Sequence, residues 1–462
     1  RVCTRNNCLV KRKLSCGHAS NSNATEHHQQ SDFKLRAAML PSSALALKRS
    51  YQINFSQWYW RRPLHLRMNM VSSQLGKRAL SSKDTSDAVS CNVPSCAMIG
   101  AGSFGSAMAN RISQSLASQN PSSTLSWYAR RQSVVDEINM QRTNKQYFPS
   151  VGPFHKNITA SNNILECVDG AKVVFLAMPT AYLSPILEQL RDEKALDDDA
   201  VLVSLAKSLK YDKETRTIKS VVNEVRTALP DHATIVLSGP NIYSEMASFD
   251  EFAEATIGYD AGGMEEARLV QQVTSSRFFQ CTLCSDRVGI ELCGGLKNVI
   301  SLATGYCEGL GLGWNAKAAV IRAGQHEIAH FMKKFDMGEP DTVFKSSAGV
   351  GDLILTCSAG RGRTLAASFV QDLLENPSSD DIGANIKRWE TLENKTLNGM
   401  KLPDWHNAQQ VYCALTDHGI VSDFPLFEAV YNIGFTGQHP STIIDALSSS
   451  IRLADEKEDL CA

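Results

Sequence analysis

Short apolar runs alternate with helical patterns over residues 95–285. The runs are rich in Val, Ile and Leu, which is typical of strands that are buried on both faces of a sheet. Between them, apolar residues recur at helical spacing, so the pattern predicts β-α-β units and a doubly wound, parallel sheet. The predicted strands are residues 96–100, 124–128, 172–177, 201–205 and 234–238.

The strand patterns stop at about residue 286. A long helical pattern opens at residues 293–298, and another covers residues 318–328 with its apolar residues on one face. The sequence therefore predicts an α/β domain at residues 91–285 and an all-helical domain at residues 286–462.

Residues 1–90 differ in composition from the rest of the chain. They contain 15 Lys and Arg against 4 Asp and Glu, whereas the whole chain is balanced, with 47 basic and 48 acidic residues. A Ser-, Arg- and Lys-rich segment with few acids is typical of an organelle transit peptide, and the alternative is a disordered basic tail. We expect import into a plastid first and a mitochondrion next, and a cytosolic protein if the segment is not a targeting signal.

The overall balance of charge gives no reason to expect a nucleic acid as partner. No window reaches about 18 uninterrupted apolar residues, so no integral membrane association is expected. The 13 Cys residues show no regular framework, and the close pair Cys281 and Cys284 has no second pair at zinc spacing. We therefore expect reduced thiols and no metal site.

A glycine-rich turn follows the first predicted strand. Gly100 permits the tight turn, Gly102 lets the backbone approach a pyrophosphate, and Gly105 lets the helix pack on the strand. Ser103 and Phe104 open the helix, whose free N–H groups would face the phosphates. A GxGxxG motif in this context predicts a Rossmann-type, NAD(P)-binding domain for residues 91–285, and the alternative is a βα turn without a ligand.

Ligands of such sheets bind at the carboxyl ends of the strands. The second strand ends at Arg130 and Arg131, without the Asp or Glu that accepts a hydrogen bond from the ribose 2′-OH of NAD. Arginines can pair with a 2′-phosphate, so NADP is possible beside NAD, although a solvated basic pair is the alternative. The later strands are followed by Pro179, Lys207, Gly239 and Asn241.

The helical half carries further candidate residues. Lys297 lies in an apolar, glycine-lined stretch, where burial would tune its amine, although a surface Lys whose stem is buried is the alternative. Asp352 begins an apolar helical run and could act as an N-cap. Arg361, Gly362 and Arg363 follow as a fork for a phosphate or a carboxylate.

Five segments of the chain resemble the NAD(P)-dependent glycerol-3-phosphate dehydrogenase family. Their occurrence together in the family's order makes the resemblance far more specific than any one motif would. The resemblance covers about residues 95–450. The segments are residues 100–107, 238–245, 294–299 with 317–322, 351–357 and 425–431.

The resemblance implies a Rossmann domain joined to a helical domain for substrate binding and dimerisation, usually in a homodimer. The family interconverts dihydroxyacetone phosphate and sn-glycerol 3-phosphate with NAD(P), which supplies glycerolipid synthesis. Lys297 matches the catalytic lysine and Asp352 the acid that holds it. Substrate binding is implied for Lys207, Gly239, Asn241, Arg361 and Gly362, and cofactor binding for Gly100, Gly102, Ser103, Phe104, Gly105, Arg130, Pro179, Lys207, Arg361 and Asn398.

Three features depart from the family pattern. Gly362 stands where the family commonly has Asn, so only backbone contact is expected there. Asn398 stands where Glu or Gln usually contacts the cofactor. Residues 376–404 are longer and more polar than the pattern requires, so we expect a surface insertion.

Two other functions fit parts of the sequence. A Rossmann reductase of a non-phosphorylated 3-hydroxy acid would share the glycine turn and a helical lysine, but would not need Arg361 and Lys207 for a phosphate. A catalytically silent dinucleotide sensor would keep the turn and could lose the acid–base group, whereas Lys297 and Asp352 are both present here.

Overall fold

The computed structural model describes residues 93–149, 153–248, 250–377, 381–397 and 401–458, which all belong to one unit, Ala88–Ala462. The predicted targeting segment, residues 1–90, lies outside the described residues. None of the helices among the described residues is long and apolar enough to cross a membrane.

The first half of this unit is built on an eight-stranded sheet, ordered β10-β9-β8-β5-β4-β1-β2-β3. Neighbouring strands are parallel except β8 and β9, which are antiparallel. The predicted doubly wound sheet is thereby confirmed. The strands are β1 (Cys96–Ile99), β2 (Leu125–Tyr128), β3 (Ile158–Ser161), β4 (Val173–Leu176), β5 (Val201–Ser204), β8 (Thr234–Ser238), β9 (Ala253–Gly258) and β10 (Phe279–Cys284).

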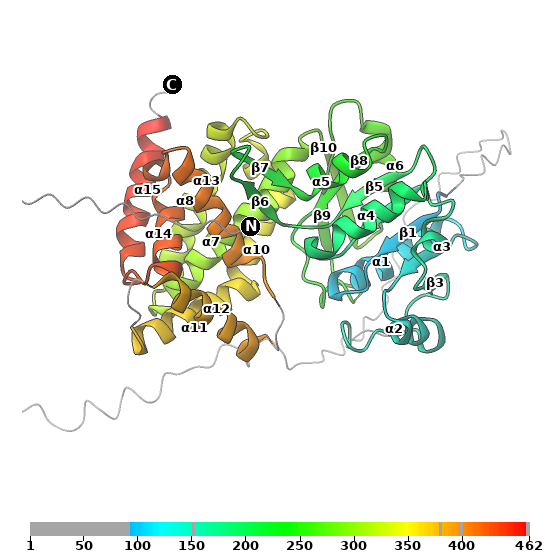
Figure 1. Ribbon diagram of the computed structural model, residues 1–462, viewed down its shortest axis with the longest axis horizontal. Coiled ribbons are helices and arrows are strands. Elements are labelled where there is room, and N and C mark those ends of the chain that lie inside the picture. The colour runs from blue at the N-terminus through cyan, green and yellow to red at the C-terminus, as the bar shows by residue number, and fades with distance from the viewer. Residues whose placement is uncertain (1–92, 150–152, 249, 378–380, 398–400, 459–462) are drawn as a thin grey trace, which may run out of the picture. The chain divides into compact units, whose positions relative to one another are not determined.

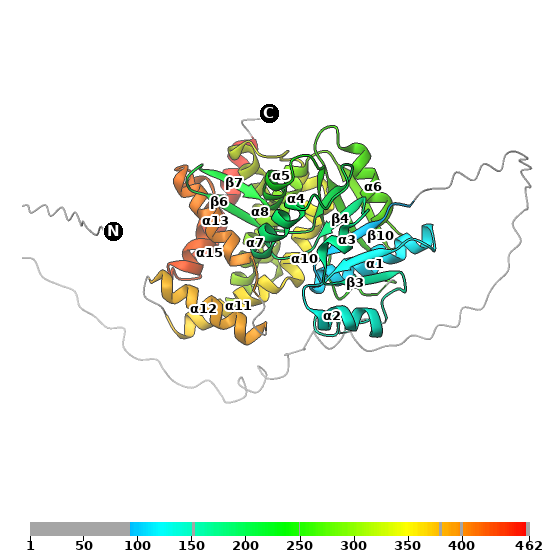
Figure 2. The ribbon, with the colours of Figure 1, turned by 45° about the vertical axis from the view of Figure 1, so that its right-hand side comes forward.

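Helices cover both faces of this sheet (Figures 1 and 2). Strands β1, β4 and β5 are buried along their whole length, as their unbroken apolar runs predict. One face packs on α1 (Ser103–Gln119), α2 (Gln132–Asp136) and α6 (Met264–Thr274). The other packs on α3 (Ile164–Val168), α4 (Leu183–Asp192) and α5 (Val221–Ala228).

Several strands were not predicted because their residues alternate between buried and exposed positions. Strands β3 and β10 lie at the two edges of the sheet, and a separate hairpin pairs β6 (Leu209–Asp212) with β7 (Thr217–Ser220). Short edge strands carry polar residues on their exposed face, so they lack the continuous apolar run of a central strand.

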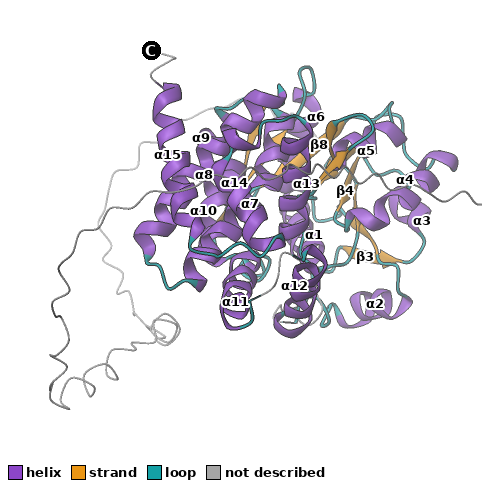
Figure 3. Ribbon diagram, turned by 60° about the vertical axis from the view of Figure 1, so that its left-hand side comes forward, coloured by secondary structure: helices purple, strands orange, loops and turns teal. Residues whose placement is uncertain are grey.

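The second half is helical, as expected (Figure 3). Helix α7 (Arg287–Gly309) is buried along almost its whole length, because α8, α10, α11 and α13 pack around it. The other helices are α8 (Trp314–Phe335), α9 (Thr342–Lys345), α10 (Asp352–Ala359), α11 (Arg361–Glu375), α12 (Ile382–Thr396), α13 (Asp404–Asp417), α14 (Pro425–Phe435) and α15 (Thr442–Glu458). Single turns complete the chain: η2 (Glu137–Gln141), η3 (Thr180–Tyr182), η4 (Ser347–Gly351) and η5 (Val421–Asp423).

The expectation of a surface insertion at residues 376–404 is wrong. The segment contains the amphipathic helix α12, whose Trp389 is fully buried and stacks on Phe369 with ring centroids 4.1 Å apart. The indole N–H donates a hydrogen bond to the Gly434 carbonyl, 2.9 Å away. The polar residues that suggested a surface loop occupy the outer face of this helix.

Helices α7 and α11 approach closely because two glycines of α7 face α11. A Cβ at Gly305 would lie 2.4 Å from the Arg363 carbonyl oxygen and 2.6 Å from Ala366 Cβ, and a Cβ at Gly309 would lie 2.6 Å from Val370 Cβ. Any side chain at Gly305 would therefore push the first turn of α11 away from α7.

Replacing Gly305 by Ser should lower the free energy of unfolding by about 1–3 kcal/mol, because the new Cβ must displace the α11 backbone. Urea denaturation of the full chain, followed by circular dichroism, measures this difference. Gly313→Ser is the matched control, since a Cβ at Gly313 has no neighbour within 4 Å; its effect should stay within about 0.5 kcal/mol. Equal losses for the two variants would contradict the close-packing argument.

Candidate active site

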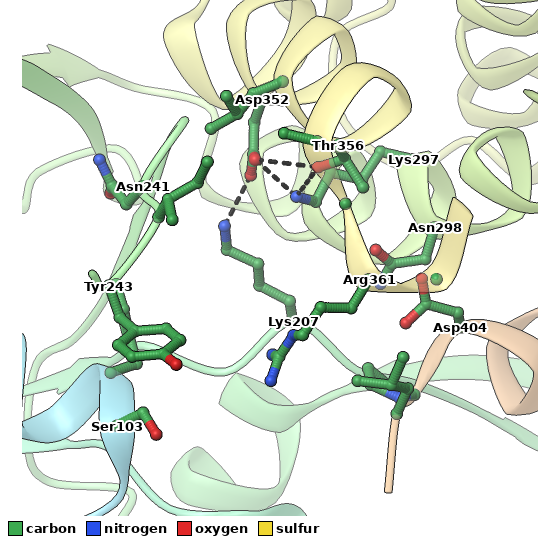
Figure 4. Close-up of a pocket in the computed structure, with 18 of the residues that line it drawn as sticks. Ser103, Lys207, Asn241, Tyr243, Lys297, Asn298, Asp352, Thr356, Arg361 and Asp404 are labelled. Atoms are coloured by element: carbon green, nitrogen blue, oxygen red, sulfur yellow. Dashed lines mark hydrogen bonds and ion pairs between the residues drawn. The ribbon is translucent and has the colours of Figure 1, made fainter. Parts of the chain in front are cut away.

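A cavity of about 530 Å³ lies between the carboxyl edge of the sheet and the helical half. Its walls come from the glycine turn, from the loops after β5 and β8, and from α7, α10, α11 and the start of α13 (Figure 4). The polar lining residues are Ser103, Lys207, Asn241, Tyr243, Ser244, Lys297, Asn298, Asp352, Thr356, Arg361 and Asp404.

Lys297 lies in the middle of α7 and is 5% exposed, so the alternative of a surface lysine is wrong. Its Nζ donates a hydrogen bond to Thr356 Oγ1 at 2.6 Å and lies 2.5 Å from Asp352 Oδ1. A buried ammonium needs such partners, because burial without them strongly disfavours the charged form.

Asp352 holds both lysines of the cavity. Its other oxygen, Oδ2, lies 2.6 Å from the Nζ of Lys207. Figure 4 shows the Nζ atoms of Lys297 and Lys207 both directed at this carboxylate. The N-cap of α10 is Gly351, and the Asp352 carboxylate pairs with the two lysines, so the N-cap alternative is wrong.

Lys207 reaches Asp352 from the loop that follows β5. Its Nζ also donates a hydrogen bond to the carbonyl of Gly239 at 3.0 Å. Gly294 on α7 lies beside its stem, where a Cβ would make an ordinary contact, 3.4 Å from Lys207 Cγ. Gly239 itself packs against β9, where a Cβ would meet the Glu254 carbonyl oxygen at 2.6 Å.

The charges of this cluster shift the pKa values of its members. Burial, with a further contribution from the Lys207 charge, lowers the pKa of Lys297 to about 8, although Asp352 opposes the shift. Burial acts to raise the pKa of Asp352, but the two ammonium groups outweigh it and hold that pKa below its ordinary value. At neutral pH the cluster therefore contains one carboxylate and two ammonium groups.

The first turn of α11 forms the opposite wall. Gly360, Arg361 and Gly362 line the cavity, and the N–H groups of a first helical turn have no acceptor within the helix. Arg363 instead points to Glu308, with which it forms an ion pair. A helix N-terminus beside an arginine favours an anion.

Asp404 is a site residue that sequence reasoning missed. It is 5% exposed and lies at the start of α13, and its Oδ1 would be 1.7 Å from a Cβ at Gly362. Burial raises its pKa to about 6, against the charges of Lys297 and Arg361. No local signal marks this carboxylate, because its position depends on how α13 packs on α11.

The glycine turn has the geometry that its sequence predicts. Gly100 has a φ of +115°, and a Cβ there would lie 2.4 Å from the Ala177 carbonyl oxygen. A Cβ at Gly105 would lie 2.5 Å from the Gly100 carbonyl oxygen, whereas one at Gly102 would have no neighbour within 4 Å. Gly102 is the N-cap of α1, so the open backbone and the helix N-terminus fit a pyrophosphate.

Two side chains far along the chain hold this turn. Asn144 is fully buried, and its Nδ2 donates hydrogen bonds to the Ala101 carbonyl and to Ser106 Oγ, each at 3.0 Å. The Trp127 indole N–H donates a hydrogen bond to the Gly100 carbonyl, also at 3.0 Å. Asn144 lies in an irregular segment that offers no pattern to find it by.

The arginines after β2 lie at the same edge of the sheet, and both are exposed. The Arg130 guanidinium lies 5.5 Å from the centroid of the Tyr182 ring, in the turn that follows Pro179. Arg131 donates a hydrogen bond to Gln146 Oε1 at 2.6 Å. Asn398 lies outside the described residues.

Asn241 and Thr356 complete the polar lining. Asn241 Nδ2 donates a hydrogen bond to the Glu254 carbonyl at 2.8 Å, while its Oδ1 is buried without a hydrogen-bond partner. Thr356, which sequence reasoning missed, lies one turn after Asp352 on α10, and its Oγ1 donates a hydrogen bond to Asp352 Oδ1 at 3.3 Å. Among the described residues, no group of three or more His, Cys, Asp or Glu could hold a metal ion.

A pyrophosphate-binding turn beside a buried, carboxylate-held lysine defines a dinucleotide-dependent oxidoreductase with a helical second domain. Family models for the two parts of NAD-dependent glycerol-3-phosphate dehydrogenase match residues 95–263 (N-terminus) and 286–445 (C-terminus). The chain belongs to this family, whose cofactor is NAD.

Individual relatives agree with this assignment. The chain is 32% identical to the human cytoplasmic NAD(+) glycerol-3-phosphate dehydrogenase over 76% of its own length and 97% of that protein. It is similar to the solved glycerol-3-phosphate dehydrogenase of Plasmodium falciparum, with 28% identity, a TM-score of 0.68 and coverage of 76% and 94% of the two chains. The solved structure of DsGPDH from Dunaliella salina gives 27% identity and a TM-score of 0.69, and the match covers 77% of this chain and 60% of that longer one.

Proposed function

We propose that the protein reduces dihydroxyacetone phosphate to sn-glycerol 3-phosphate with NADH, and catalyses the reverse reaction, to supply glycerolipid synthesis. The observation that carries this proposal is the Asp352 carboxylate, which holds Lys297 and Lys207 together at the sheet edge, 2.5 and 2.6 Å from their Nζ atoms. The cavity thus combines a proton donor, Lys297, with a second cation, Lys207, and with the N-terminus of α11, which can bind an anion.

The substrate phosphate would bind at the first turn of α11. Arg361 supplies a guanidinium there, and the helix N-terminus supplies N–H groups and a partial positive charge. Gly362 can contribute only its backbone to this contact. Lys297 lines the same cavity as this turn, so a three-carbon substrate whose phosphate binds at α11 would direct its ketone, on carbon 2, toward Lys297.

Lys297 would polarise the ketone and donate the proton that the developing alkoxide needs. Its pKa of about 8 keeps it protonated at neutral pH, yet makes it a stronger acid than an ordinary lysine. Asp352 and Thr356 fix the direction of its Nζ. Lys207 keeps Asp352 ionised, and Asn241 Oδ1, which lacks a partner, would accept a hydrogen bond from a substrate hydroxyl.

The nicotinamide cofactor, when bound, supplies or accepts the hydride at carbon 2. Gly100, Gly102 and Gly105 would hold its pyrophosphate with Ser103 and Phe104. Arg130 and Pro179 would face its adenosine, at the ends of β2 and β4.

The two rival functions have less support. A reductase of non-phosphorylated 3-hydroxy acids would not need Arg361 and Lys207 for a phosphate. A silent sensor would not need the buried Lys297–Asp352 pair, since a buried ion pair is costly to maintain.

We also propose that residues 1–90 direct the protein to an organelle, with a plastid favoured over a mitochondrion. Their basic, acid-poor composition supports this location. Dimerisation through the helical domain, residues 286–462, is a further proposal, and so is the assignment of residues 91–285 to cofactor binding.

The purified protein should oxidise NADH with dihydroxyacetone phosphate. Dihydroxyacetone, which lacks the phosphate, should give a kcat/KM lower by about 10² or more, because it forfeits the charge-assisted contacts at α11. Equal efficiency with the two ketones would contradict the phosphate assignment. NADH binding without any turnover would favour the sensor.

Replacing Lys297 by Ala should lower kcat by about 10² or more while NADH still binds, because the lost proton donor acts in the transition state. Steady-state kinetics and NADH fluorescence titration measure the two effects. Lys345→Ala is the control, since Lys345 is exposed and forms a surface ion pair with Asp341. Turnover within a few-fold of the parent would remove Lys297 from the mechanism.

The absence of an acid after β2 leads us to expect that NADPH is accepted as well as NADH, since no carboxylate there repels a 2′-phosphate. Changing both Arg130 and Arg131 to Ala should weaken the binding of NADPH more than the binding of NADH. The difference should be at most about tenfold, because both arginines are exposed. Kd values for both cofactors test this, with Arg277→Ala as a distant control. Equal losses would show that these arginines do not contact the 2′ position.

A further inference from the structure

The carboxyl group of Asp404 occupies the space that a side chain at position 362 would need. A Cβ at Gly362 would lie 1.7 Å from Asp404 Oδ1 and 2.5 Å from its Cγ. The first turn of α11 therefore presents a carboxyl group to the cavity, and this group is supplied by the start of α13. The Asp404 carboxyl group thus fills the position that a side chain of residue 362 would occupy, although it comes from a distant part of the chain.

This carboxyl group has no close cation. Among the described residues, no Lys, Arg or His nitrogen lies within 4.0 Å of it, whereas Asp352 in the same cavity holds two ammonium groups. Figure 4 shows Asp404 on the side of Arg361 and Asn298, away from the Asp352 cluster. The two buried carboxyl groups of the cavity thus have opposite surroundings.

The charged groups around Asp404 act in opposite directions, with the cations having the larger effect, and burial outweighs them all. Lys297 on α7 and Arg361 on α11 favour its ionised form, and Glu393 on α12 disfavours it. Lys207 and Asp352 lie on the other side of the cavity, where they neutralise each other in part. The remaining charged residue of the α11 turn, Arg363, is turned toward Glu308. On α13 itself, His406 stacks on Trp405.

A substrate phosphate at this turn would meet the Asp404 carboxyl group. A phosphate dianion and a carboxylate in one buried pocket repel each other, as two carboxylates that share a site do. One proton between them turns the repulsion into a short, charge-assisted hydrogen bond. Asp404 and a phosphate monoester both titrate near pH 6, so either can carry that proton.

We propose that Asp404 is a specificity-determining residue that shares one proton with the substrate phosphate, so that the phosphate end of the substrate binds together with a proton. The inference rests on the proposed function, since it places the phosphate at α11. Arg361 and the helix N-terminus require only that the bound end of the substrate is an anion. Asp404 adds the requirement that this end of the substrate carries or accepts a proton.

The test is the proton uptake that accompanies binding of sn-glycerol 3-phosphate to the full protein saturated with NADH. Isothermal titration at pH 7.5 in buffers of different ionisation enthalpy should give an uptake close to one proton. Between pH 6.5 and 7.5 the Kd should rise about sixfold, less than the tenfold of one fully linked proton because both groups are already partly protonated at pH 6.5. Asp404→Asn places a permanent N–H donor in the same space, so uptake should fall near zero and the Kd should change less than about twofold.

Two further variants separate this role from a structural one. Gly362→Ala alone should displace the carboxyl group and abolish the proton uptake, whereas Gly362→Ala with Asp404→Gly relieves the clash and should restore stability without the uptake. If the parent fails to bind glycerol 3-phosphate, the proposed function is wrong. If it binds with equal proton uptake in parent and Asp404→Asn, the proposed function stands and the role of Asp404 is wrong.

Discussion

One buried carboxylate joins the two halves of this protein at its cavity. Asp352 comes from α10, Lys297 from α7 and Lys207 from a loop of the sheet domain, so three separate parts of the chain meet at two oxygen atoms. Removing one charge from water is costly, and the Coulomb attraction compensates only when the geometry is close. Both contacts are 2.6 Å or shorter, and Thr356 adds a hydroxyl to the same group.

This arrangement leaves one net positive charge on the cluster of Asp352, Lys297 and Lys207. A single lysine with a single aspartate would be neutral and would attract no anion, whereas two lysines on one carboxylate remain cationic after they are satisfied. The low pKa of Lys297 comes mainly from its burial, and the charge of Lys207 lowers it further. The second lysine therefore adds both to the attraction for an anion and to the acidity of Lys297.

Glycines make this convergence sterically possible. Gly305 lets α11 approach α7 closely, so that Arg361 reaches the cavity. The same argument holds for Gly100, whose positive φ and contact with the β4 end place the start of α1 at the sheet edge. These positions carry no chemistry themselves, yet each determines where a reactive or binding group lies.

The sequence was sufficient for the elements whose pattern is local. The central strands, the glycine turn and α7 are each specified by a continuous apolar run or a fixed spacing, and they appear where predicted. Strand β10 and the β6-β7 hairpin were missed, since buried and outward-facing residues alternate along them. Strand β9 was missed although four of its six residues are buried. Helix α12 was misjudged because its polar face dominates the composition, while the burial of Trp389 depends on contacts with α11 and α14.

The site residues divide in the same way. The sequence identified Lys297, Asp352 and Lys207 because each lies in a recognisable motif. It did not identify Asn144 and Asp404, because they contact a motif only after folding brings distant parts of the chain together. Gly362 illustrates the difference most clearly: in the sequence it is a missing side chain, but in space the carboxyl group of Asp404 takes its place. A small residue at a binding position of a motif therefore does not show that the site lacks a polar group there. A neighbouring helix can supply a polar group in the same space, and that group can differ in charge from the side chain that it replaces. Here that change replaces a neutral contact with a titratable one, which makes the protonation of the substrate end part of its recognition.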